Sequence, residues 1–187
     1  MEQEILKSSE VLLSGGTILY PTDTLPGLGC DANNVESVQK IIDIKGRYSD
    51  KGFIILLDDD RKLYSYMKEV PDMAWDLIEH STEPITIIFP NGKNVAPKVL
   101  AEDGSIAIRI TKDPFCKGLI RKFGRAIVST SANISGGIPA QSIDKIDPTI
   151  QNTVDHIVNL PSAQSGKPQP SKIIKLELDG EIRFIRN

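Results

Sequence analysis

The chain has 187 residues, of which 40% are hydrophobic and 25% are charged, and its net charge is −3. This length suits one domain of roughly 100–200 residues, and the composition is that of an ordinary globular protein, which excludes disorder, collagen and coiled coil. The apolar runs at 53–57 and 85–89 are far shorter than the roughly 20 residues of a membrane helix. Because the mixed, acidic first residues do not resemble a targeting peptide, we expect a cytoplasmic protein without membrane contact.

Two cysteines and two histidines limit the available chemistry. Cys30 and Cys116 stand far apart, with no Cys or His at metal spacing, which argues against a disulfide framework or a zinc site. We expect both to be ordinary thiols. His80 and His156 lack a credible serine or cysteine partner in the sequence, which disfavours a triad hydrolase.

Helix-like and strand-like segments alternate along the chain. Apolar residues at helical spacing predict helices at 3–13, 34–45, 60–68, 72–80, 114–123 and, more weakly, near 141–146. Short β-rich apolar runs predict strands at 17–20, 53–57, 85–89, 105–110, 126–130 and near 156–159. A polar loop at 161–170 precedes a terminal hairpin that turns at Asp179-Gly180. The pattern predicts a single α/β domain over 1–187, with helices flanking a mixed parallel/antiparallel sheet.

Polar residues gather at three points where a strand or helix gives way to a loop. They are 21–29 after the first strand, Lys45-Gly46-Arg47 at the end of helix 34–45, and 129–137 directly after the apolar strand residues 126–128. Taken singly, each also fits ordinary turn chemistry or basic residues at a helix end. Ligands of open α/β sheets bind beyond the carboxyl ends of strands. Together the three features therefore predict an anionic ligand, with two cations for charge and hydroxyl and amide donors for orientation.

Three further features have competing interpretations. Arg109 alternates with isoleucines on strand 105–110, so it is either a sheet-surface residue or a clamp for a carboxylate or phosphate. Gly27-Leu28-Gly29-Cys30-Asp31-Ala32 fits G-x-G-x-x-A, but two prolines separate it from the preceding strand, which disfavours a dinucleotide oxidoreductase. We interpret a basic cluster around helix 114–123 as a solvated face rather than an RNA contact; it comprises Lys117, Arg121, Lys122 and Arg125.

The runs YPTDTLPGLGCDA, IKGR, KGFIIL, AIRIT, VSTSANISG and PSKII, in this order, resemble the YrdC-type threonylcarbamoyl-AMP synthase family. The resemblance covers roughly residues 10–187 and fits the short, single-domain form. It implies a twisted mixed sheet with a concave basic groove. It also implies a nucleotidyltransferase that condenses L-threonine, bicarbonate or CO₂, and ATP into threonylcarbamoyl-AMP and pyrophosphate. A tRNA-modifying threonylcarbamoyl transferase machinery would then use the product, and direct tRNA contact stays open.

The resemblance also assigns roles to individual residues. The family's K-x-R and S-x-N motifs hold ATP phosphates and fall on Lys45, Arg47, Ser131 and Asn133, with Lys45 and Arg47 as the catalytic cations. The implied threonine contacts are Thr22, Arg109, Ser129 and Ser171. A C-terminal arginine that contacts nucleotide matches Arg186, with Arg183 as the weaker match. Mg²⁺ is expected with ATP, held mainly by the phosphates rather than by a protein metal site.

A non-catalytic RNA-binding or ribosome-associated module with the same basic groove is the alternative. It would show salt-dependent RNA affinity without ATP turnover. Aromatic residues make up only 5% of the chain and form no RNP-type pattern, which disfavours this alternative.

Overall fold

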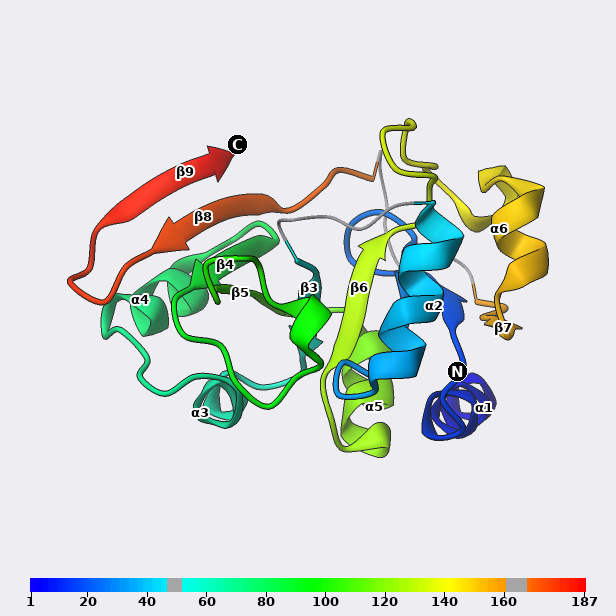
Figure 1. Ribbon diagram of the computed structural model, residues 1–187, viewed down its shortest axis with the longest axis horizontal. Coiled ribbons are helices and arrows are strands. Elements are labelled where there is room, and N and C mark those ends of the chain that lie inside the picture. The colour runs from blue at the N-terminus through cyan, green and yellow to red at the C-terminus, as the bar shows by residue number, and fades with distance from the viewer. Residues whose placement is uncertain (47–51, 161–167) are drawn as a thin grey trace.

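Helices and strands alternate along residues 1–46, 52–160 and 168–187, which a computed structural model describes (Figure 1). The helices are α1 (Glu2–Leu13), α2 (Val35–Lys45), α3 (Leu63–Tyr66), α4 (Met73–His80), α5 (Pro114–Phe123) and α6 (Pro148–Thr153). Short 3₁₀ turns are η1 (Asp60–Lys62), η2 (Pro97–Val99) and η3 (Ile143–Lys145). The strands are β1 (Ile18–Tyr20), β2 (Gly27–Gly29), β3 (Ile54–Leu57), β4 (Ile85–Phe89), β5 (Ile106–Ile110), β6 (Ile127–Ser131), β7 (His156–Ile157), β8 (Lys172–Leu176) and β9 (Ile182–Arg186).

The strands form one sheet in the order β7-β1-β2-β6-β3-β5-β4-β8-β9. The pairs β1–β7, β3–β5 and β4–β8 are parallel, and the other neighbours are antiparallel. The predicted mixed sheet is therefore confirmed, as is the terminal hairpin of β8 and β9. Among the described residues, no helix is long and apolar enough to cross a membrane.

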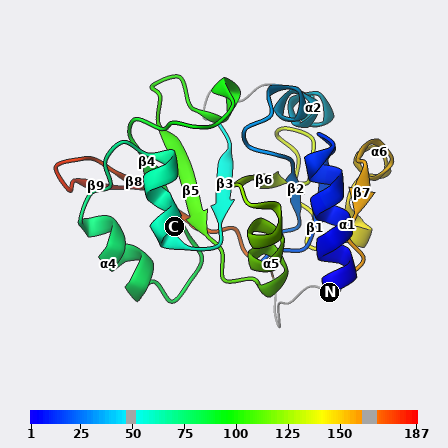
Figure 2. The same cartoon turned by 90° about the horizontal axis from the view of Figure 1, so that it is seen from below.

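Each face of the sheet has its own apolar core. On one face, α1 and α5 cover Ile18, Tyr20, Leu56 and Ile127. On the other face, α2 and the segments around α3 and α4 cover a second cluster that includes Ile55. Figure 2 shows α2 on one side of the strands, with α1 and α5 on the other. Alternate residues of one strand thus enter different cores, as the two-residue period of a strand requires.

Capping residues set the ends of the two helices predicted most closely. The side chain of Asn34 accepts a hydrogen bond from the Ser37 N–H at 2.9 Å, and α2 ends at Gly46 with a φ of 75°. Asp113 caps α5 by accepting from the Cys116 N–H at 2.8 Å, and Gly124 ends that helix with a φ of 83°. Glycine adopts these left-handed conformations without a Cβ clash.

Strand β2 was not predicted, and it excludes the dinucleotide interpretation of its glycines. Gly27–Gly29 pairs with β1 and β6 inside the sheet, whereas the phosphate-binding pattern must form a turn that opens a helix. A Cβ at Gly29 would lie 2.6 Å from the Val128 carbonyl oxygen and 2.8 Å from the Tyr20 ring. These glycines therefore permit the close approach of neighbouring strands and a tyrosine ring.

The weak helix predicted near 141–146 is wrong in position. That segment holds only the η3 turn, and α6 begins later, at Pro148, where the Asp147 side chain accepts from the Thr149 N–H at 2.8 Å. The predicted polar loop at 161–170 lies mostly outside the described residues. Cys30 and Cys116 are buried free thiols, as expected.

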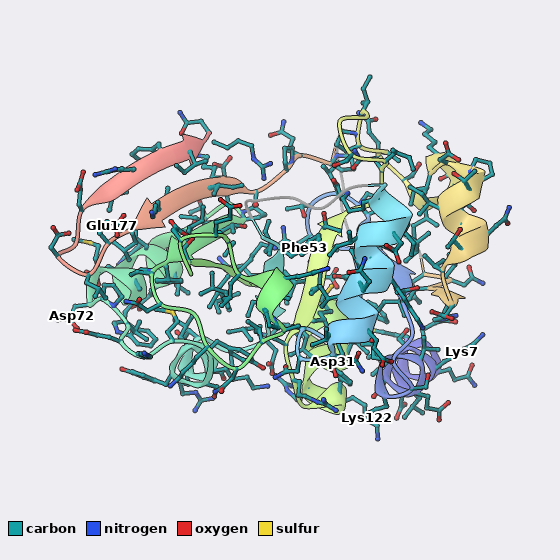
Figure 3. All side chains as sticks on the ribbon, in the orientation of Figure 1. Lys7, Asp31, Phe53, Asp72, Lys122 and Glu177 are labelled. Carbon is teal, nitrogen blue, oxygen red and sulfur yellow. The ribbon has the colours of Figure 1, made fainter. Side chains whose placement is uncertain are left out.

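The basic cluster near α5 is held partly by acidic neighbours. Arg125 pairs with Asp31 at 2.8 Å, and Arg121 lies 3.6 Å from Asp58. Figure 3 shows Lys122 on the outer side of α5, at the margin of the molecule. This arrangement agrees with the predicted solvated face.

Candidate active site

A pocket of about 370 Å³ opens on the sheet where the cover of α1 and α5 ends. Ile127, Ser129 and Ser131 lie at alternate positions of β6, so they share one face. Ile127 is packed in the core beneath α5, whereas the two serines line the pocket. The same strand thus passes from core to pocket, because its sequence changes from apolar to hydroxyl side chains on that face.

Among the described residues, seven elements or their adjoining loops contribute to the wall of this pocket: α2, β2, β3, β5, β6, β8 and β9. The polar and charged side chains in the described lining are Thr24, Lys45, Arg109, Ser129, Thr130, Ser131, Asn133, Ser135, Ser171 and Arg186. Seven of the nine site residues predicted from the sequence are among them. Arg47 lies outside the described residues, and Thr22 lies elsewhere.

Arg109 supplies a buried positive charge to the pocket. Only 4% of this residue is exposed. Its Nη1 donates to Thr24 Oγ1 at 2.7 Å, and its Nη2 is 3.4 Å from the carboxylate of Asp23. Its buried Nε finds no hydrogen-bond partner among the described residues. A buried donor without a partner indicates a position where a ligand or water completes the network.

Lys45 brings a second cation to the pocket lining. Its Nζ donates to the carbonyl oxygens of Ser131 and Asn133 at 2.8 and 3.0 Å. Burial lowers the pKa of Lys45 to about 8, because a charged amine loses solvation there. The Lys45 side chain therefore holds the end of β6 in place. It is also part of the pocket lining.

The loop after β6 is ordered around Asn133. The Ser131 hydroxyl donates to Asn133 Oδ1. Asn133 Nδ2 donates to the carbonyl oxygens of Ile134 and Gly137 at 2.9 and 2.8 Å. The S-x-N pair thus shapes a compact loop whose Gly136, with a φ of 84°, also lines the pocket.

Ser171 and Arg186 form a third wall. Arg186 donates from Nε and Nη2 to the Ser171 carbonyl oxygen at 3.0 and 2.8 Å. The Ser171 hydroxyl shares a 2.8 Å hydrogen bond with Thr86, which is fully buried in β4. Burial, and secondarily the nearby Arg109 cation, lower the pKa of Arg186. Of the two C-terminal candidates, Arg186 lines the pocket, whereas Arg183 pairs with Glu181 on the surface.

Thr22 is not among the residues that line this pocket. Its hydroxyl accepts from the Thr24 N–H at 2.9 Å, donates to the Leu25 carbonyl at 2.8 Å and lines a neighbouring cavity of about 180 Å³. It therefore closes a turn, which is the ordinary use of threonine in such a loop. Thr24, which the sequence reasoning did not single out, lines both the candidate pocket and this neighbouring cavity. The signal was present in the PTDT run, but the sequence does not show which hydroxyl faces inward.

The lining suits an anionic ligand with several acceptor groups. It combines the cations Lys45, Arg109 and Arg186 with serine and threonine hydroxyls, and no carboxylate occurs among its described members. The part of the chain that the structure describes also contains no cluster of three His, Cys, Asp or Glu residues that could hold a metal. The hydroxyl and amide oxygens of Ser131 and Asn133 are compatible with Mg²⁺ that arrives bound to phosphates.

The chain is similar to known proteins over nearly its whole length. The Sua5/YciO/YrdC family model, described as telomere recombination, matches residues 10–187. A protein of Idiomarina loihiensis named threonylcarbamoyl-AMP synthase is 33% identical over 162 residues, which are 85% of this chain and 86% of that protein.

Solved structures share the fold. Escherichia coli YciO superimposes with a TM-score of 0.85 at 25% identity, over 100% of this chain and 90% of that chain. Sua5 of P. abyssi, solved in complex with L-threonine, has a TM-score of 0.81 at 27% identity and is matched by 94% of this chain. The match spans 52% of the Sua5 chain, about half of its length.

Proposed function

The chain belongs to the Sua5/YciO/YrdC family, and on that premise we propose that it is a threonylcarbamoyl-AMP synthase. In this proposal it is a nucleotidyltransferase that joins L-threonine, bicarbonate or CO₂, and ATP, and releases pyrophosphate. The supporting observation is one pocket that brings Lys45, Arg109 and Arg186 together with hydroxyl and amide donors. Such a set can hold an amino-acid carboxylate and a triphosphate at the same time.

Arg109 is assigned to the threonine carboxylate. A guanidinium presents several donors in one plane, which suits a carboxylate. Thr24 and Ser129 lie in the same lining, and Ser171 has its hydroxyl oriented by Thr86. These hydroxyls provide the polar contacts that orient the rest of the amino acid. The L-threonine complex of the P. abyssi protein supports this choice of substrate.

Lys45 is assigned to the ATP phosphates, together with Ser131, Asn133 and Arg186. Its ammonium has two donors engaged with backbone carbonyls, so a third N–H is available to a phosphate oxygen. Arg47, two residues later in the K-x-R motif, is assigned the same task from the family resemblance alone, since it lies outside the described residues. Mg²⁺ bound to the phosphates would neutralise part of their charge.

The reaction requires two anions to be brought together. The threonine amine first captures CO₂ as a carbamate and gives up a proton to solvent. A carbamate oxygen then attacks the α-phosphorus, and the bond from that phosphorus to the bridging oxygen breaks, so pyrophosphate leaves. Positioning and neutralisation of charge account for the catalysis. Lys45 and Arg47 provide positive charge where the leaving group becomes more negative.

The product implies further partners, which belong to the same proposal. Threonylcarbamoyl-AMP is an activated acyl group, so a transferase must pass it to tRNA. We place this sequence of reactions in the cytoplasm, where ATP, threonine and tRNA are all present. Direct contact between this chain and tRNA, through a basic concave groove around the pocket, is a prediction of the resemblance.

Pyrophosphate release tests the proposal directly. The purified chain is incubated with ATP and Mg²⁺, with and without L-threonine and bicarbonate. We expect release only when both co-substrates are present. Pyrophosphate release that does not depend on threonine would contradict the synthase assignment. So would the absence of release when threonine is bound. RNA affinity that depends on salt, without any ATP turnover, would support the RNA-binding alternative.

A further inference from the structure

Asp23 lies beside the Arg109 guanidinium, where the loop between β1 and β2 meets β5. Its carboxylate is 3.4 Å from Arg109 Nη2, while the next residue, Thr24, accepts from Nη1 at 2.7 Å. Two consecutive residues of one loop therefore contact two different nitrogens of the same cation. Because the guanidinium is planar and rigid, a hydrogen bond at one nitrogen and an ion pair at another together favour one direction of the whole group.

Asp23 is anchored in turn to the backbone beyond β5. Its Oδ2 accepts from the Lys112 N–H at 3.2 Å and from the Thr111 hydroxyl at 3.5 Å. The Thr111 hydroxyl also accepts from the N–H of Asp113, the capping residue of α5. The turn between β5 and α5 thus holds the Asp23 carboxylate in place through these contacts.

From this geometry we propose that Asp23 is a positioning residue that holds Arg109 in the direction required by the substrate carboxylate. The inference rests on the proposed function, because it takes Arg109 as the carboxylate clamp. Asp23 itself lines a separate small cavity of about 40 Å³ with Ile108 and Ile110, residues that lie on the other face of β5 from Arg109. It therefore acts through Arg109 and not by contact with the substrate.

Charge and orientation predict opposite effects for the loss of this carboxylate. The negative charge of Asp23 offsets part of the attraction between Arg109 and an anionic substrate. If net charge alone mattered, Asp23→Asn would strengthen threonine binding. If the carboxylate serves to orient Arg109, the same change weakens binding, since losing a well-aligned hydrogen bond to a charged group costs roughly 10- to 100-fold in affinity. The sign of the change in affinity therefore separates the two roles.

The chain offers a matched control. Asp31 is also an aspartate paired with an arginine, at 2.8 Å from Arg125, and its side chain is 5% exposed. This pair lies outside the lining of the large pocket. Asp31→Asn therefore removes a buried carboxylate from another arginine without altering Arg109, although Arg125 is more exposed than Arg109, at 45% against 5%. Any general effect of losing a buried ion pair on the fold appears in both variants.

The test measures L-threonine binding by titration calorimetry, together with KM values for threonine and ATP from pyrophosphate release. We expect Asp23→Asn to raise the threonine Kd and KM by roughly 10- to 100-fold and to leave the KM for ATP unchanged. Asp23→Glu, which keeps the charge but shifts it, should weaken threonine binding less. Asp31→Asn should leave threonine binding at the wild-type value. Thermal unfolding of each variant reports whether it is folded.

Unchanged or tighter threonine binding by Asp23→Asn would overturn the inference, as would an equal loss in Asp31→Asn. If the Asn variant does not fold, Asp23→Glu serves as the deciding variant, and wild-type affinity there would overturn the inference. Wild-type protein that binds threonine without turnover would contradict the proposed function alone, since the calorimetric comparison still applies. Wild-type protein that does not bind threonine would overturn both.

Discussion

The Lys45 ammonium donates a 2.8 Å hydrogen bond to the carbonyl oxygen of Ser131 and so joins the end of α2 to the end of β6. A second bond to the Asn133 carbonyl extends this link into the loop after β6. The K-x-R and S-x-N motifs are therefore in direct contact, although they are far apart in the sequence. One side chain both shapes the loop and provides charge to the pocket.

Lys45→Ala and Arg47→Ala should each lower turnover by about 10²–10³, the scale for losing a donor that stabilises transition-state charge. Steady-state pyrophosphate release measures the effect. Lys40→Ala is the matched control for Lys45, because Lys40 is an exposed lysine of the same helix whose Nζ donates to the Gly15 carbonyl. Wild-type rates in Lys45→Ala and Arg47→Ala would contradict the phosphate role.

The rate should fall in alkaline solution. Burial lowers the pKa of Lys45 to about 8, so the charged form is complete below this pH and is lost as the pH rises through it. kcat/KM for ATP reports groups of the free enzyme and should therefore decrease above about pH 8. Lys45→Arg, which stays charged, should lack this alkaline decrease even if its rate is lower. A decrease with the same midpoint in Lys45→Arg would assign it to another group.

Ser171→Ala should raise the KM for threonine more than the KM for ATP, because it removes a hydroxyl from the threonine side of the pocket. Thr86→Val should act in the same direction but more weakly, since it removes only the partner that orients Ser171 at 2.8 Å. Both constants come from pyrophosphate release at varied substrate concentrations. An unchanged threonine KM in Ser171→Ala would argue against that contact.

Arg186→Ala and Arg183→Ala compare two arginines of the same strand, β9. Arg186 lines the pocket and donates to Ser171, whereas Arg183 pairs with Glu181 on the surface. We expect Arg186→Ala to raise the KM for ATP roughly 10- to 100-fold, in line with about 1.5–3 kcal/mol for a hydrogen bond to a charged group, and Arg183→Ala to have no effect. Equal effects of the two changes would remove the reason for preferring Arg186.

Gly29→Ala should destabilise the fold. The added Cβ would lie 2.6 Å from the Val128 carbonyl oxygen and 2.8 Å from the Tyr20 ring, and overpacking of this kind costs about 1–3 kcal/mol. Urea unfolding measures the loss as a lower midpoint with an unchanged slope. A wild-type midpoint would mean that β2 can move away from β6 without cost.

The sequence predicted the elements whose ends carry a chemical signal. Asn34 and Gly46 bracket α2, and Asp113-Pro114 and Gly124 bracket α5, so the boundaries of both helices could be predicted closely. β2 was missed because a three-residue strand with two glycines lacks the β-branched residues that indicate a strand. The helix predicted near 141–146 is replaced by α6, which begins later. This start could have been predicted, since Asp147-Pro148 is a typical helix start.

The loops that form the site could be predicted from the sequence, but the directions in which their side chains point could not. The hydroxyls of Thr22 and Thr24 are equivalent in the sequence, and only the turn of the loop decides that Thr24 faces the pocket. The buried pairing of Arg109 with Asp23 is likewise invisible in the sequence, because the two residues meet only when β5 and the loop after β1 become neighbours across the sheet. Individual side-chain roles therefore depend on tertiary packing.

The pocket takes its walls from Thr24 near the start of the chain and from Arg186 in its last strand. During synthesis, a chain that has reached β6 already contains the serines of that strand but lacks both Ser171 and Arg186. Substrates therefore cannot bind a completed site, and cannot stabilise the fold by binding, until β9 has left the ribosome and paired with β8. The segments that precede β9 must therefore fold without help from a ligand that needs the completed site.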